Sequence, residues 1–118
     1  MNKVLIVEDE LGYFRTIERY LKDSVEVLWA KSLSAGSQLF KENSADIKVI
    51  IMDACVDSGH PDSMDLIREI INSGYKGPII SNSTSMDYDE YLVRAGATHR
   101  SSGKGKEAAE LALQLLNQ

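Results

Sequence analysis

The sequence has little of what marks secreted, membrane-bound or disulfide-linked proteins. Cys55 is its only cysteine, so no disulfide can form within the chain, and a reducing compartment suits it. Only 2 of its 118 residues are proline, and it has no low-complexity stretch. Its apolar runs are too short to span a bilayer, and we expect neither a signal peptide nor a lipid anchor. These absences predict a globular protein of the cytoplasm.

Positive charge is also scarce. The chain carries 18 acidic residues against 13 Lys and Arg, which gives a formal net charge of -5. Surfaces that bind nucleic acid or anionic membranes need an excess of basic residues, so we expect neither as a direct partner. The length suits one hydrophobic core, and a content of 43% hydrophobic and 26% charged residues is ordinary for a globular domain. We therefore predict a single domain over residues 1–118.

Short apolar runs alternate with amphipathic segments five times along the chain. The runs that predict strands are residues 4–7, 25–29, 47–52, 78–80 and 97–102. Helical spacing of apolar residues follows each run, beginning with Leu11, Phe14, Ile17 and Leu21. Ser32 is a predicted helix N-cap. This alternation is typical of repeated strand–helix units.

Five such units predict an α/β fold with a parallel sheet that is doubly wound, with five helices on its two faces. A closed barrel needs eight units and about twice this length. The natural strand order is 2-1-3-4-5, the flavodoxin-like arrangement, in which strands 1 and 3 are neighbours. Ligands of such sheets bind between the carboxyl ends of these two strands. Glu8, Asp9 and Asp53 fall at that position.

Acidic residues at this edge of the sheet restrict what can bind there. Glu8, Asp9 and Glu10 would repel a nucleotide or flavin phosphate, which excludes a flavin carrier. A cluster of carboxylates repels itself unless protons or a cation neutralise it. Carboxylate and carbonyl oxygens suit Mg²⁺, or Mn²⁺ in its place, and there is no Cys/His cluster of the kind that binds zinc. The sequence predicts a magnesium site.

Four short motifs together resemble the receiver domains of two-component response regulators, the family of the chemotaxis response regulator. They are residues 4–10 (VLIVEDE), 50–53 (IIMD), 78–83 (PIISNS) and 95–97 (AGA). Each motif alone is short, and their order and spacing carry the resemblance. It extends over the whole chain, strand by strand.

The resemblance implies a role for each acidic residue. Asp53 corresponds to the aspartate that accepts a phosphoryl group from the phosphohistidine of a histidine kinase or a histidine phosphotransfer protein. Asp9 corresponds to the direct Mg²⁺ ligand, and Glu8 to the residue that acts through water. Asp53 itself and the backbone carbonyl of Cys55 complete the implied metal ligands.

The resemblance also implies a hydroxyl and a lysine that contact the phosphoryl oxygens. Ser83 corresponds to the hydroxyl residue, with Thr84 as the alternative if the register differs by one. Lys104 is our candidate for the lysine, and Lys106 is the second candidate. The lysine slot itself, counted from Gly96, falls on Gly103, and no proline follows either lysine.

One further departure concerns the fifth strand. Receivers carry an aromatic residue there that reports phosphorylation to the opposite face, and this sequence has Arg100 or Ser101 at that place. The resemblance therefore leaves open whether the conformational switch is intact.

As a function, the resemblance implies a phosphoprotein that signals by conformational change and contact with a downstream protein target. It would not be an enzyme beyond self-catalysed acceptance and hydrolysis of its phosphoryl group. It would be a stand-alone regulator or a domain of a longer protein, and the family also forms homodimers. The alternative is a pseudo-receiver, which acts as an interaction module without phosphorylation. A small phosphohydrolase is disfavoured, because Cys55 stands where such enzymes need a second aspartate.

Overall fold

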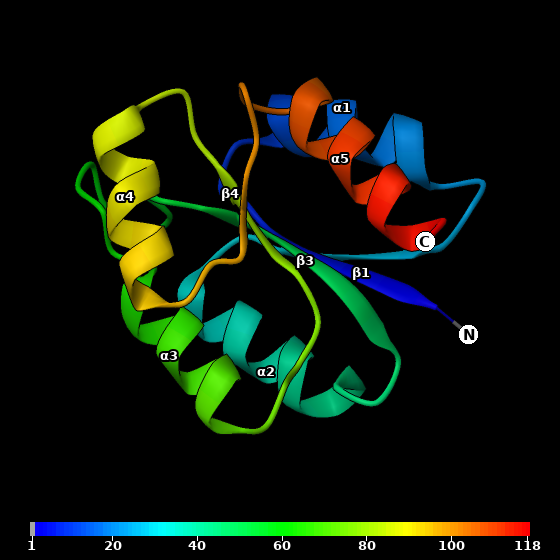
Figure 1. Cartoon of the computed structure of the whole chain (residues 1–118), viewed down its shortest axis with the longest axis horizontal. Helices are drawn as coiled ribbons and strands as arrows, with labels where there is room; N and C mark the ends of the chain where they lie inside the picture. The colour runs from blue at the N-terminus through cyan, green and yellow to red at the C-terminus, as the bar shows by residue number, and fades with distance from the viewer. Residues whose placement is uncertain (1) are drawn as a thin grey trace.

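The predicted parallel sheet forms, with the strand order β2-β1-β3-β4-β5 and helices on both faces (Figure 1). The structure is a computed structural model and describes residues 2–118. Its strands are β1 (Lys3–Val7), β2 (Glu26–Ala30), β3 (Ile47–Asp53), β4 (Ile79–Asn82) and β5 (His99–Arg100). Its helices are α1 (Leu11–Leu21), α2 (Leu33–Asn43), α3 (Met64–Asn72), α4 (Met86–Ala95) and α5 (Lys106–Leu116).

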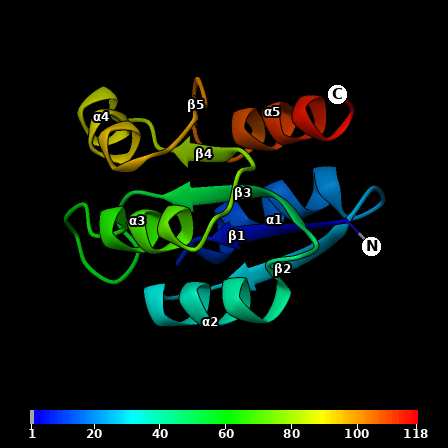
Figure 2. The ribbon, with the colours of Figure 1, turned by 60° about the horizontal axis from the view of Figure 1, so that its bottom comes forward.

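Two apolar layers hold the helices against the sheet (Figures 1 and 2). Side chains alternate between the faces of a strand, so Val4 and Ile6 pack with α1 and α5, while Leu5 and Val7 pack with α2, α3 and α4. All four are fully buried, which explains the continuous apolar run in β1. Among the described residues, no helix is long and apolar enough to cross a membrane.

The register of the strands brings three polar residues to one edge. Val7 in β1 is opposite Met52 in β3, and Asp53 in β3 is opposite Asn82 in β4. Because the strands are parallel, their carboxyl ends finish side by side. Glu8, Asp53 and Asn82 therefore meet although they lie far apart in the sequence.

The last two strands differ from the sequence prediction. β4 extends to Asn82, because Ser81 and Asn82 pair with Met52 and Asp53 despite their polar side chains. β5 is only His99–Arg100, not 97–102, and the chain then turns through a loop in which the Ser101 hydroxyl donates to the Gly103 carbonyl. β2 begins and ends one residue later than predicted.

The helix ends follow the local signals in the sequence. The Ser32 hydroxyl caps α2 by accepting from the Ala35 amide at 3.1 Å. Gly74 and Gly96 follow α3 and α4 with φ of 98° and 130°, values that residues with a side chain rarely adopt. A Cβ at Gly96 would also lie 1.9 Å from Cδ1 of Ile71, whereas one at Gly74 would meet no atom within 4 Å.

This difference predicts the cost of adding a methyl group at each glycine. Gly74→Ala should lower the free energy of unfolding by about 1 kcal/mol through backbone strain. Gly96→Ala should lower it by about 2 to 3 kcal/mol, because the clash with Ile71 adds to the strain. Urea unfolding of the two variants measures both values. Equal losses would show that Ile71 moves aside without cost.

Candidate functional site

Three acidic side chains meet at the carboxyl edge of the sheet. Glu8 and Asp9 follow β1, and Asp53 ends β3. Each offers a carboxylate oxygen, and these oxygens all lie within 4.8 Å of one another. Glu8 is fully buried, Asp53 is 4% exposed, and Asp9 is exposed. The cluster therefore has two buried carboxylates and one that faces solvent.

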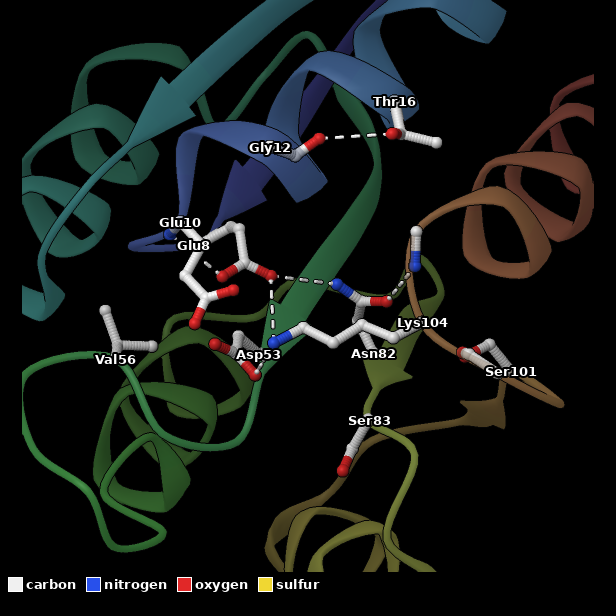
Figure 3. Close-up of polar contacts among 12 residues, drawn as sticks. Glu8, Glu10, Gly12, Thr16, Asp53, Val56, Asn82, Ser83, Ser101 and Lys104 are labelled. Carbon is white, nitrogen blue, oxygen red and sulfur yellow. Dashed lines mark hydrogen bonds and ion pairs between the residues drawn. The ribbon is translucent and has the colours of Figure 1, made fainter.

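Hydrogen bonds fix the orientation of Glu8 (Figure 3). Its Oε2 accepts from the Glu10 amide at 3.1 Å, and its Oε1 accepts from Nδ2 of Asn82 at 3.2 Å. Its backbone carbonyl accepts from Nε1 of Trp29 at 2.7 Å. Elements on both sides of β1 thus hold the residue in place.

Lys104 provides the positive charge nearest to these acids. Figure 3 shows its side chain reaching from the loop before α5 to the two buried carboxylates. Its Nζ lies 3.3 Å from Oδ1 of Asp53 and 3.5 Å from Oε1 of Glu8, and it lies 4.3 Å from the centre of the Tyr13 ring. Lys106, the second candidate, instead pairs with Glu110 on the surface of α5 at 3.9 Å.

One lysine does not balance the buried negative charge. Burial, and then the charge of Asp53, raise the pKa of Glu8 to about 8. Burial also raises the pKa of Asp53, although the charge of Lys104 opposes this. Burial alone would lower the pKa of Lys104, but the charges of Asp53 and Glu8 outweigh it and raise this pKa. The cluster attracts protons, and a further cation would serve the same purpose.

The donor set suits a hard divalent ion. Carboxylate oxygens are the groups that Mg²⁺ and Mn²⁺ prefer, and Asp9 and Asp53 line an open cleft of about 580 Å³ with room for water ligands. Cys55 lines the same cleft. Burial raises the pKa of its thiol, so the side chain stays neutral. The residues present therefore fit the predicted magnesium site.

The predicted hydroxyl residues also line this cleft, at the end of β4. Ser83 and Thr84 lie there together with Asp53 and Lys104. The Ser83 hydroxyl accepts from the Ser85 amide at 3.0 Å, and in Figure 3 it points away from the carboxylates. A contact between Ser83 and a group on Asp53 would need this side chain to rotate.

The acidic residues of the loop after Asp53 organise the loop itself. Asp62 accepts from the amides of Val56 at 2.8 Å and Asp57 at 2.9 Å. Asp57 accepts from the Leu33 amide at 3.1 Å, at the start of α2. These bonds give both carboxylates a structural role.

Polar contacts join the fifth strand to α4 where receivers have an aromatic residue. Nη2 of Arg100 lies 2.5 Å from Oε2 of Glu90 in α4, and hydrogen bonds from Arg100 and Arg94 hold the pKa of Glu90 below its ordinary value. The Ser101 hydroxyl donates to the Ser81 carbonyl at 3.1 Å, and the Ser81 hydroxyl bonds to Asp89 of α4. The link between β5 and α4 is therefore polar.

Sequence reasoning missed two residues of the site. Asn82, which is fully buried, bonds to Glu8, and Tyr13 on α1 lies against Lys104. The only signal for Asn82 is its place in the polar stretch 81–85 after the run 78–80, which indicates the end of the strand. Tyr13 lies next to the apolar stripe of α1 and gave no signal.

Among comparisons with known proteins, only the one with solved structures found matches, and these support the fold. No family model and no curated protein matches the sequence. Among solved structures, a response regulator receiver domain protein from Clostridium thermocellum is 25% identical with a TM-score of 0.77, covering 99% of this chain and 95% of that one. The chemotaxis protein CheY4 of Vibrio cholerae is 24% identical with a TM-score of 0.76, covering 97% of each chain.

A longer protein contains the same fold as one part. NtrX from Brucella abortus is 18% identical with a TM-score of 0.79, covering 99% of this chain, and this chain spans 27% of the length of that NtrX chain. The likeness thus extends over nearly the whole of the present chain in all three structures. The resemblance predicted from the sequence is confirmed at the level of the fold: the chain has the fold of a response regulator receiver domain.

Proposed function

We propose that this chain is a phosphoryl-accepting receiver, with Asp53 as the acceptor and a histidine kinase or histidine phosphotransfer protein as the donor. The observation that carries the proposal is the position of Asp53. Its carboxylate lines an open cleft, 3.3 Å from the Lys104 ammonium and beside the Glu8 and Asp9 carboxylates. A nucleophile for phosphoryl transfer needs this combination of access and neighbouring charge.

The chemistry is a direct displacement at phosphorus. An Asp53 oxygen forms the new O–P bond while the P–N bond to the donor histidine breaks, and its electron pair returns to the imidazole. Lys104 would neutralise the phosphoryl oxygens, and Ser83 would donate to one of them after turning from the Ser85 amide.

A divalent ion would supply the remaining positive charge. Glu8 through water, Asp9, Asp53 and the backbone carbonyl of Cys55 would hold Mg²⁺, or Mn²⁺ in its place. The ion would neutralise both the attacking carboxylate and the phosphoryl oxygens. The raised pKa values of Glu8 and Asp53 support this part of the proposal, because burial makes both ionised carboxylates unfavourable unless a cation lies beside them.

The phosphorylated form would signal in the cytoplasm through contacts with a downstream protein. α4 is the element that would carry the change, since Ser81 and Arg100 connect it to the strands beside the site. The chain would act on no external substrate as an enzyme. Its chemistry would be limited to accepting and hydrolysing its own phosphoryl group.

One observation favours a second function, a receiver fold used as an interaction module without phosphorylation. Arg100 or Ser101 stands where an aromatic switch residue would be, and Arg100 pairs with Glu90 of α4 without any phosphoryl group. The intact cluster of Glu8, Asp9 and Asp53 supports the first function instead.

Phosphoryl uptake separates these two functions. Incubation with Mg²⁺ and acetyl phosphate should add one phosphoryl group to the wild type and none to Asp53→Asn, as read by intact mass. Asp57→Asn is the matched control, because Asp57 lines the same cleft but bonds to the α2 amide of Leu33. A folded wild type that binds Mg²⁺ and takes up nothing would establish the interaction module instead.

The two lysine candidates should differ in the rate of uptake. Lys104→Ala removes the ammonium group beside Asp53, and the rate should fall by on the order of 100-fold, as for loss of one preorganised charge-stabilising group. Lys106→Ala removes an exposed lysine that pairs with Glu110, and the rate should stay within about twofold of wild type. Time courses of intact mass give both rates. The reverse order would assign the role to Lys106.

The pKa of Glu8 predicts how stability changes with pH in metal-free buffer. Glu8 titrates near 8 in the folded protein and near 4.5 in the unfolded chain, so between these values the folded state holds a proton that the unfolded state has lost. Stability from this group is therefore present below about pH 4.5 and is lost as the pH rises towards about 8. Glu8→Gln removes this loss and should be more stable than wild type by up to about 4 kcal/mol at about pH 8.

Urea unfolding across this range measures the effect, with the exposed Glu10→Gln as a control of equal charge change. Added Mg²⁺ should stabilise the wild type most at the upper end, because the ion binds the ionised carboxylates of the folded state. Parallel pH curves for wild type and Glu8→Gln would contradict the assignment.

A further inference from the structure

We propose that Asn82 is a positioning residue that holds the Glu8 carboxylate and the Lys104 loop in one geometry. Its consequence for phosphoryl transfer rests on the proposed function, whereas its role in holding the loop does not. Asn82 ends β4, between the strand that leads to Glu8 and the loop that carries Lys104 (Figure 3).

The Asn82 amide uses both of its ends in buried hydrogen bonds. Nδ2 donates to Oε1 of Glu8 at 3.2 Å, and Oδ1 accepts from the Gly105 amide at 3.0 Å. The residue is fully buried. A carboxylate at this position would repel Glu8, and an apolar side chain would leave both partners unsatisfied. The amide can satisfy a carboxylate and a backbone N–H at the same time.

The Lys104 loop needs such an anchor. Lys104 stands between Gly103 and Gly105, and Gly105 has a φ of 86° and a ψ of -98°, in a region open to glycine. β5 ends at Arg100, and Ser101 is the last residue of this segment that bonds to β4, through the Ser81 carbonyl. The bond from the Gly105 amide to Asn82 fixes the backbone one residue after Lys104.

Asn82 also orients Glu8, which pairs with Lys104. Oε1 of Glu8 accepts from Asn82 and lies 3.5 Å from the Lys104 Nζ, so the amide orients the same oxygen that pairs with the ammonium. The Tyr13 ring also contacts Lys104, whose Nζ lies 4.3 Å from the ring centre. Loss of the amide would therefore release the loop at Gly105 and loosen the ion pair at Glu8 together.

Amine labelling of the folded protein tests the loop directly. In the wild type the Lys104 side chain is 15% exposed and paired with two carboxylates, whereas Lys106 is 60% exposed and serves as an internal reference. Asn82→Leu should raise the ratio of Lys104 to Lys106 labelling by roughly threefold or more, because the loop opens more often. The Gly105 amide should exchange its hydrogen faster in the same variant.

Two further variants keep the test decisive. Asn82→Asp keeps an oxygen that accepts from Gly105 but repels Glu8, so its Gly105 exchange should be slower than in Asn82→Leu. Asn82→Ser has a small polar side chain that cannot reach both partners. If Asn82→Leu does not fold, Asn82→Ser should show the rise in Lys104 labelling and in Gly105 exchange in its place. Asn43→Leu is the matched control, because it removes the hydrogen bonds of another asparagine, to Lys3 and Leu39, away from the site. It should change neither the Lys104 to Lys106 labelling ratio nor the exchange of the Gly105 amide.

The outcomes separate this inference from the proposed function. Wild-type labelling and exchange in folded Asn82→Leu would overturn the positioning role. If the wild type accepts phosphoryl groups, Asn82→Leu should also lower the uptake rate at saturating Mg²⁺ by roughly tenfold or more, because the lysine is misplaced. A wild type that takes up no phosphoryl group would end the proposed function and leave the labelling result standing.

Discussion

Two buried carboxylates, Glu8 and Asp53, share one ammonium group, that of Lys104, and the rest of the site depends on this imbalance. Each acid ends or follows a strand whose apolar residues form the core, and this position keeps both carboxyl groups buried. Burial raises both pKa values, and the charge of Asp53 adds to this at Glu8, so this edge is a place for protons or a divalent ion.

This arrangement costs stability, as sites built for binding often do. A fully apolar edge would fold without the desolvation of Glu8 and Asp53. The structure offsets the cost locally, with hydrogen bonds to Glu8 from Glu10 and Asn82. These bonds fix the orientation of the Glu8 carboxyl group.

The connection from the site to its surroundings is made of hydrogen bonds and ion pairs. Ser81 reaches α4 through Asp89, and Arg100 reaches it through Glu90. Ser101, which follows β5, donates to the Ser81 carbonyl in β4. Under the proposed function, polar links of this kind would respond to a new charge at Asp53 through electrostatics, which differs from the packing change that a buried aromatic residue would report.

The sequence by itself determined the sheet, its strand order and the meeting of Glu8, Asp9 and Asp53, because apolar runs and their spacing are local signals and parallel strands end together. Only the tertiary structure decided the extent of β4, the choice of Lys104 over Lys106 at the acids and the part of Asn82. Each of these depends on bonds between residues distant in the sequence. Asn82 and Glu8, for example, are 74 positions apart, and no local pattern records a bond that exists only when the sheet has formed.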